Sequence, residues 1–443
     1  MKSRALPAEE LPTRPDREVP RSRIYPWAVF ALTFGLLLSD YMSRQVLNAV
    51  FPFLKAEWLL SDSQLASLTS VVALTVAVLT FPLSILADRW GRVRSLVLMA
   101  TIWSLATVLC AIAGDYDQML GARFLVGAGE AAYGSVGIAV VLSVFAPSVR
   151  ATFGGAFMAG GSFGSTIGVA LGGVIAVQFG WRWALAFMAA IGLVLIVLFR
   201  LVVTQRRLDR YQHEDEATAV DEPAANAGQR APFSSLFSNA SVCCVYLGSG
   251  LQMFVAAVLL VWTPSYLNRY HAMSPDTAGL VSAILVLLIG AGMIVCGVIT
   301  DRASKRRPER KWTTAISYSA ASALLLAIGF QLQASSLQLV VLGLGAFFSA
   351  GASGPATAMV ANLTHSSLRA SGFGALTLSN SLLGLAAGPF VVGILADGLG
   401  LLAALQLMPL VYIGAVTALL VGKRTYPAGL RRLAALNTHQ PPA

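Results

Sequence analysis

Residues 84–94 read SILADRWGRVR, an apolar run that ends in an Asp-Arg pair and continues as a basic loop. A related run, GVITDRASKRR, occupies residues 297–307 and carries its Asp-Arg pair at the same place. Each run has the composition expected where a hydrophobic helix leaves a membrane on the side that collects Lys and Arg. Their repetition indicates a chain assembled from two similar halves.

The composition of the whole chain is that of a polytopic membrane protein. Of its 443 residues, 56% are hydrophobic and only 12% are charged, and the mean hydropathy is +0.71; soluble domains are about one quarter charged. Apolar stretches recur that are long enough, at about twenty residues, to cross a hydrocarbon core of about 30 Å. We predict an all-α membrane protein with twelve transmembrane helices, over residues 26–48, 65–87, 94–114, 119–146, 151–178, 183–203, 240–267, 276–300, 313–332, 337–362, 370–396 and 401–421.

The Lys and Arg residues are distributed unevenly between the loops. The segment before residue 26 and every second loop after it are basic, whereas the opposite loops carry only Lys55, Arg182 and Arg269. This asymmetry predicts that both termini are cytoplasmic, in the plasma membrane or, in a bacterium, the inner membrane. It also accounts for the net charge of +10, so we expect anionic lipid headgroups, and not nucleic acid, beside the basic loops.

The order of the predicted spans divides the chain into five regions. We expect a cytoplasmic tail (1–25), a six-helix half (26–204), a polar cytoplasmic linker (205–236), a second six-helix half (237–422) and a cytoplasmic tail (423–443). The halves also echo each other in GSTIGVALGG (164–173) and GLAAGPFVVG (384–393). Two similar halves, related by pseudo-symmetry, are typical of transporters whose central site opens to either side in turn.

The run at 84–94 resembles the loop signature of the major facilitator superfamily, Gly-x-x-x-Asp-Arg-x-Gly-Arg-x-Arg, with Ser84 in place of the first Gly. The second run matches the weaker copy of that signature through Gly297, Asp301 and Arg302, and RFLVGAGEA (123–131) resembles the signature of span 4. The resemblance implies the twelve-helix facilitator fold and alternating access. We expect a monomer, because nothing in the sequence requires a partner chain.

Two groups within the superfamily are similar to this chain. GEAAY, DYMSRQVLNAVFP (40–52) and WTPSYLNRYHAMS (262–274) resemble the Spinster-like transporters. The organic-anion symporters share an Arg in span 1, Gly-Glu in span 4 and residues similar to GWRW. The first resemblance implies an amphiphilic or lipid-like substrate and the second a small organic anion.

Four ionisable residues fall well inside predicted spans: Asp40 and Arg44 in span 1, and Arg123 and Glu130 in span 4. Each charge at the membrane centre costs at least about 2.5–3.5 kcal/mol, so such residues usually face a wet cavity. Spacings of four and seven residues put each pair on one helix face, the second pair within about 20°. The resemblance places spans 1 and 4 at the central cavity.

Two interpretations of this cluster remain open. In the first, Glu130 or Asp40 exchanges protons, and Arg44 or Arg123 holds a substrate anion or serves as the charge partner of the carboxylate. In the second, the four residues are salt bridges that only join the two spans. Two neighbouring tyrosines, Tyr41 and Tyr133, are candidates for the pocket lining or for packing.

The loop signature implies a cytoplasmic gate made of Asp88, Arg89, Gly91 and Arg92, with Asp301 and Arg302 in the second copy. An Asp at the end of span 2 can accept hydrogen bonds from the exposed N–H groups at the start of a facing helix, which the resemblance identifies as span 11. Alternatively, the arginines only set the membrane orientation.

Glycines suggest close packing and a hinge. Gly164, Gly168 and Gly172 match an antiporter signature that has Pro where this chain has Val169, so symport and antiport both stay open. Small residues at this spacing equally serve helix packing. Gly388 and Pro389 in span 11 are a candidate hinge.

The sequence contains no pattern that predicts an enzyme, a metal site or a cofactor. From the resemblance and the charged residues inside spans 1 and 4, we expect a proton-coupled secondary active transporter of an amphiphilic or lipid-like organic substrate. The alternatives are a proton-driven symporter of small organic anions and, from another class, a membrane sensor or receptor that binds a ligand without transporting it.

Overall fold

The computed structural model describes residues 24–145, 150–205, 207–208, 237, 239–365 and 368–438. Nearly all of the expected amino-terminal tail, most of the expected linker and residues 439–443 lie outside the described residues. The described ranges are helical, without a strand, and contain twelve helices long and apolar enough to cross a membrane. The predicted all-α architecture with twelve spans is confirmed.

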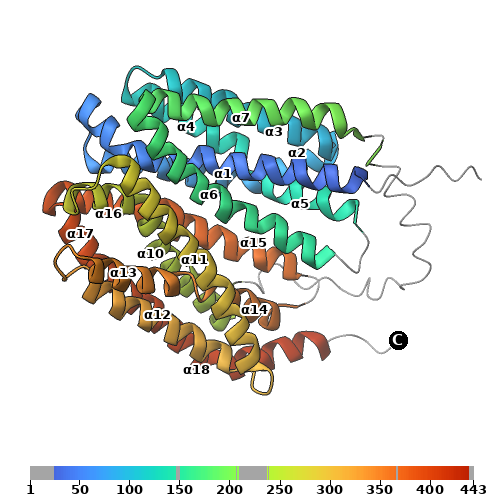
Figure 1. The fold of residues 1–443 in the computed structure, drawn as a ribbon. Helices are drawn as coiled ribbons and strands as arrows, with labels where there is room; N and C mark the ends of the chain where they lie inside the picture. Colours follow the sequence, from blue (N-terminus) through green and yellow to red (C-terminus); the bar gives the residue numbers. More distant parts are fainter. Residues whose placement is uncertain are drawn as a thin grey trace, which may run out of the picture.

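The first six spans form the amino-terminal half, drawn in blue to green in Figure 1. Its helices are α1 (Ile24–Trp58), α2 (Asp62–Trp90), α3 (Arg92–Ile112), α4 (Tyr116–Glu130), α5 (Tyr133–Ser143), α6 (Arg150–Phe179) and α7 (Trp181–Val202). The fourth span is not one continuous helix, because α4 ends at Glu130 and α5 begins at Tyr133.

The last six spans form the carboxy-terminal half. Its helices are α10 (Ala240–Tyr270), α11 (Pro275–Ser304), α12 (Arg310–Gly329), α13 (Ser336–Ser349), α14 (Ser353–Leu363), α15 (Arg369–Ser379), the π-helix η3 (Asn380–Ala386), α16 (Ala387–Leu399), α17 (Leu401–Leu407), the 3-10 turn η4 (Met408–Leu410) and α18 (Val411–Thr438). The tenth span is broken between α13 and α14, as the fourth is between α4 and α5, which supports the internal repeat.

Two helices extend beyond their predicted spans. α1 continues through Pro52 to Trp58, and α18 continues to Thr438, into the region expected as a tail. Hydropathy marks only the part of a helix that lies in hydrocarbon, whereas Ala, Leu and Arg keep the backbone helical beyond it.

The two halves meet at one side of the molecule. We define the linker side as the side where α7 ends and α10 begins, and the distal side as the side where α1 ends and α2 begins. The halves pack through α6 against α11, α2 against α16 and η3, and α1 against α10. In Figure 1 their helices lie together at the distal side, on the left, and diverge toward the linker side, where the C-terminus lies.

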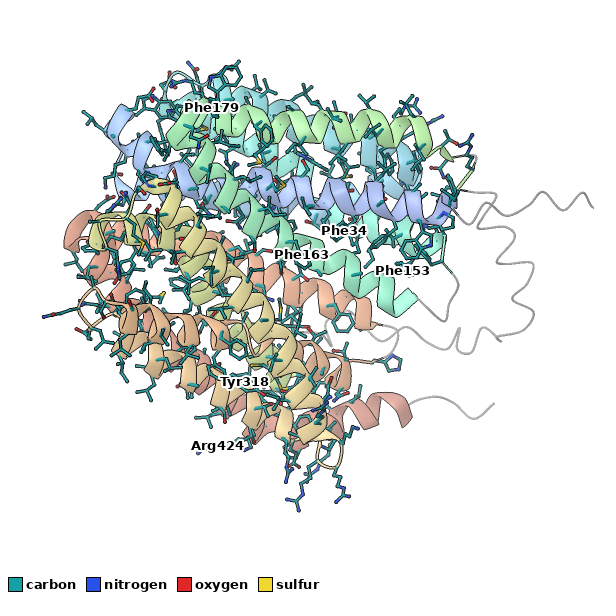
Figure 2. All side chains as sticks on the ribbon, in the orientation of Figure 1. Phe34, Phe153, Phe163, Phe179, Tyr318 and Arg424 are labelled. Atoms are coloured by element: carbon teal, nitrogen blue, oxygen red, sulfur yellow. The ribbon has the colours of Figure 1, made fainter. Side chains whose placement is uncertain are left out.

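The outside of the bundle is apolar. Val194 of α7, Ile294 of α11, Leu324 of α12 and Ile413 of α18 are each more than half exposed. Side chains cover the outer faces of both halves in Figure 2. Exposed apolar residues on so many helices are expected of a surface that faces lipid.

Candidate functional site

An ion pair joins spans 1 and 4. The Nε atom of Arg44 on α1 donates to Oε2 of Glu130 on α4 at 3.0 Å, and Nη2 donates to the same oxygen. The Glu130 side chain is 1% exposed and that of Arg44 is 20% exposed. Glu130 is the last residue of α4, so the break in the fourth span directly follows the acidic member of the pair.

Asp40 lies beside this pair. Its side chain is buried and interacts with both Glu130 and Arg44. Oδ1 of Asp40 and Oε1 of Glu130 have no hydrogen-bond partner among the described residues. Two buried carboxyl groups therefore lie near one guanidinium, which pairs with Glu130, and each carboxyl group has one buried oxygen without a partner among the described residues.

The second arginine of the cluster has a different environment. Arg123 is fully buried; its Nε donates to the Leu68 carbonyl of α2 at 3.1 Å and its Nη1 to the Ser43 carbonyl of α1 at 3.4 Å. The Arg123 side chain thus ties α4 to the main chains of two other helices, α1 and α2, inside the amino-terminal half. The sequence predicted the same possible roles for Arg123 and Arg44, but Arg44 pairs with a carboxylate and Arg123 bonds to backbone carbonyls.

The two tyrosines also differ. The ring of Tyr41 lies 5.6 Å from the Arg44 guanidinium carbon, in cation–π geometry. Tyr133 is fully buried, donates to the Thr33 carbonyl at 2.9 Å and packs edge-on against Trp103. Tyr41 therefore flanks the ion pair, whereas Tyr133 belongs to the interior of its half.

A small pocket of about 40 Å³ lies between the halves next to Arg44. Its wall from α1 and α2 is largely polar and its wall from α10 and η3 is apolar. The lining residues are Arg44, Gln45, Asn48, Thr69, Ala73, Ala257, Leu260, Val261 and Leu385. Apart from Arg44, the polar residues that line this pocket were not predicted from the sequence, although Asn48 continues the four-residue spacing of Asp40 and Arg44.

The halves are joined at the distal side by what we call the distal latch, made of Asp62, Arg269 and Asp397. Arg269 of α10 donates to both carboxylate oxygens of Asp62 on α2, at 2.8 and 2.6 Å. The carboxylate of Asp397 on α16 accepts from the backbone N–H groups of Asp62 and Ser63, at 2.6 and 3.0 Å. These donors are the unpaired N–H groups at the start of α2, so one half caps a helix of the other.

The latch residues were also missed, although the sequence contained a signal. ILADRWG (85–91) recurs as ILADGLG (394–400). Gly91 and Gly400 both have positive φ, 94° and 84°, and their N–H groups bond to the carbonyls of Ala87 and Ala396. The motif that ends span 2 at the linker side therefore also ends span 11 at the distal side.

The proposed gate at the linker side is only partly described. Arg89, Asp301 and Arg302 are exposed and Arg92 is half-buried, and within the described residues none of them forms an ion pair. The side chain of Asp88 lies outside the described residues.

The glycines of α6 lie against α1. A Cβ atom built on Gly164 would lie 2.5 Å from the Leu38 carbonyl oxygen, and one on Gly168 would lie 2.7 Å from Met42 Cα. Gly172 faces Val46 at 2.8 Å in the same way. These positions lack room for any side chain.

Gly388 and Pro389 lie in the first turn of α16, just after the π-helical part of span 11. Gly388 lies against the main chain of Phe254 on α10, and the Pro389 carbonyl accepts from Trp262 Nε1 at 3.1 Å. The π-helix η3 directly precedes this pair. Because Pro389 has no N–H, regular helical bonding is interrupted here.

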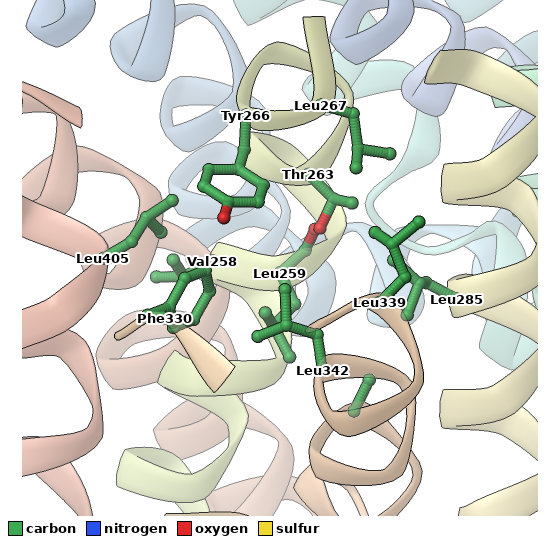
Figure 3. Close-up of a pocket in the computed structure, with 11 residues that line it drawn as sticks. Val258, Leu259, Thr263, Tyr266, Leu267, Leu285, Phe330, Leu339, Leu342 and Leu405 are labelled. Atoms are coloured by element: carbon green, nitrogen blue, oxygen red, sulfur yellow. The ribbon is translucent and has the colours of Figure 1, made fainter. Parts of the chain in front are cut away.

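A second cavity, of about 20 Å³, lies inside the carboxy-terminal half (Figure 3). Tyr266, Phe330 and several leucines surround it. Such a volume has room for about one water molecule, so an apolar chain does not fit there in this conformation.

No three His, Cys, Asp or Glu side chains of the described ranges are grouped so that they could hold a metal ion. The four cysteines are free.

Twelve spans in two halves, with buried charges beside a pocket between them, define a membrane transporter. The chain belongs to the Major Facilitator Superfamily, whose sequence pattern matches residues 33–389 and 245–439. The relatives described next are transporters of this superfamily and not enzymes.

Two curated relatives represent the two groups considered above. The chain is similar to the probable L-galactonate transporter of Escherichia coli (strain K12), with 28% identity over 305 residues, 66% of each chain. It is 25% identical to protein spinster homolog 1 of Xenopus laevis over 244 residues, 54% of this chain and 45% of that protein. The chain thus spans just under two thirds of the length of the first relative and less of the second.

A solved structure supports the fold. A bacterial homologue of the human lysosomal transporter Spinster, in an inward-facing and unoccupied conformation, has a TM-score of 0.78 at 18% identity, over 92% of this chain and 99% of that chain. The resemblance to Spinster-like transporters, with organic-anion transporters also similar, is confirmed.

Proposed function

We propose that the chain couples proton movement to the transport of an organic anion that has an apolar part, by alternating access. The observation that carries this proposal is the Arg44–Glu130 ion pair, with Asp40 beside it, at a pocket with one polar and one apolar wall. The basic loops favour both termini on the cytoplasmic side of the plasma membrane, and the chain acts as a monomer.

The coupling follows from competition for one guanidinium. A substrate carboxylate that binds Arg44 takes the place of the Glu130 carboxylate. Glu130 is then left without its counter-ion next to Asp40, and a buried carboxylate in that position is costly unless it binds a proton. Anion binding and proton binding therefore favour each other. One anion on Arg44 and one proton on Glu130 would cross the membrane together.

Alternating access follows from the two ends of spans 2 and 11. The distal latch is closed in this conformation, and separation of its members would open the distal side. We propose that Asp88 then accepts from the start of α15 at the linker side, with Arg89, Gly91 and Arg92 in the same loop and Asp301 and Arg302 in its repeat. Gly388, Pro389 and η3 would supply the hinge.

A small organic anion is the second candidate substrate. The polar wall of the pocket and the name of the L-galactonate relative favour it. An amphiphile or lipid-like molecule is favoured by the apolar wall and by the similarity to spinster homolog 1. Both candidates place an anionic group on Arg44.

The test is proton flux in proteoliposomes that contain a pH-sensitive dye. With saturating organic anion, we expect flux from the native chain and none above background from Glu130→Gln, because the amide cannot exchange a proton. The matched control is Glu57→Gln, since Glu57 pairs with Arg182 at the distal surface, and it should retain flux. Anion binding without flux in the native chain would indicate a sensor and contradict the proposal.

A further inference from the structure

Asn48 occupies a special position at the pocket beside Arg44. It follows Arg44 by one helical turn on α1 and is 2% exposed. Its Nδ2 donates to Gln45 Oε1 at 2.5 Å and, across the interface of the halves, to the Leu260 carbonyl of α10 at 3.3 Å. Its Oδ1 is buried without a partner among the described residues.

The orientation of the Asn48 amide follows from its surroundings. The Leu260 carbonyl is part of the main chain and accepts only, so the amide end that faces it must be the NH₂ group. The remaining atom is therefore the carbonyl oxygen, which requires a donor. A buried acceptor without a donor is unfavourable, so a ligand or water that brings an O–H or N–H to this place is stabilised.

Prolines add further acceptors around the same pocket. In a regular helix, each carbonyl accepts from the N–H four residues later. Three pocket-lining residues precede a proline by this spacing: Asn48 with Pro52, Leu260 with Pro264, and Leu385 with Pro389. Proline has no N–H to donate, so the carbonyls of Asn48 and Leu260 lose their regular helical donor, whereas Leu385 lies in the π-helix η3. Leu260 receives Asn48 Nδ2 instead.

The pocket thus combines one cation with an excess of acceptors. Arg44 attracts an anionic group, whereas Asn48 Oδ1 requires a hydrogen-bond donor. A simple carboxylate has no donor to offer, and a hydroxyl group supplies one. An ammonium group would also supply donors, but it would be repelled by the guanidinium of Arg44.

We propose that Asn48 determines specificity for a hydroxylated organic anion, with the substrate hydroxyl donating to Asn48 Oδ1 while the anionic group binds Arg44. This inference rests on the proposed function and specifies its substrate class. Because Nδ2 of the same amide bonds to α10, the hydroxyl is recognised by a residue that also touches the opposite half.

The test compares anions that differ by one hydroxyl group: mandelate with phenylacetate, and 3-hydroxydecanoate with decanoate. Binding to the purified full chain in detergent is measured by titration calorimetry. We expect the native chain to bind the hydroxylated member of at least one pair about tenfold or more tightly, in line with the cost of an unpaired buried acceptor. Asn48→Leu should reduce that ratio to near one while both members still bind through Arg44.

The control is Thr101→Val on α3, outside the pocket lining, because the Thr101 hydroxyl donates only to the Val97 carbonyl of its own helix; it should retain the native ratio. Asn48→Ala replaces Asn48→Leu if thermal unfolding shows that the larger side chain destabilises the fold. Equal binding within both pairs by the native chain, or a preference that survives loss of Asn48, overturns the inference and leaves the proposed function intact. Failure of all four anions to bind contradicts both.

Discussion

At the scale of single residues, the two arginines of the charged cluster have the same side chain but different environments, and we expect different roles for them. Arg44 is partly exposed and bonds to a carboxylate that a substrate can replace. Arg123 is fully enclosed and bonds to main-chain carbonyls that no substrate can replace. We infer that Arg44 belongs to the transport site and that Arg123 holds the site in shape.

One substitution made at both positions tests this division. We expect Arg123→Met to lower the free energy of unfolding by about 3 kcal/mol, because two bonds from a charged group to buried carbonyls are lost. Arg44→Met should destabilise less, since Glu130 can bind a proton when its partner is gone, but should abolish anion binding. Thermal unfolding and titration of mandelate measure the two effects. Equal loss of stability with retained binding in both variants would contradict the division.

At the scale of helices, spans 2 and 11 control the distal side. Asp397 satisfies the first two N–H groups of α2 and Asp62 pairs with Arg269, so the start of α2 is held by two helices of the other half. The repeated motif ILAD-x-x-Gly puts residues Asp88 and Asp397 at opposite ends of this helix pair. A rocking motion would therefore exchange one capping interaction for the other.

We predict that Asp397→Asn shifts the population toward separation at the distal side, because an amide is a weaker cap than a carboxylate. Spin labels on cysteines introduced at the exposed residues Leu59 and Leu399, with the native cysteines replaced, report the distance across this side. The variant should show a larger long-distance fraction than the parent. The control is Asp115→Asn, which changes a cap inside one half; a shift of the same size there would show that the effect is not specific.

The contact between α6 and α1 yields a stability prediction. Gly164→Ala places a methyl group 2.5 Å from the Leu38 carbonyl oxygen, so the helices must separate, and we expect a lower unfolding temperature. Gly121→Ala is the matched control, because no atom lies within 4 Å of its added Cβ. If both variants unfold at the same temperature as the native chain, this close contact does not matter for stability.

At the scale of the whole molecule, the sequence predicted the number of spans and their division into halves, because apolar length and basic loops follow directly from the bilayer. It also indicated Arg44 and Glu130, since charges in apolar helices stand out. It did not indicate Arg269 or Asp397, because charges at helix ends are common and their partners lie in the other half. The role of Asn48 depends on Leu260, a contact that only the folded chain creates.

The central proposal is that the anion and the proton bind to the same charged cluster and that each strengthens the binding of the other. Titration calorimetry of mandelate binding in two buffers with different ionisation enthalpies measures the protons taken up per anion bound. We predict uptake of about one proton by the native chain, because one carboxylate loses its guanidinium partner, and none by Glu130→Gln. Binding to the native chain without proton uptake, or uptake that persists in Glu130→Gln, would contradict the account.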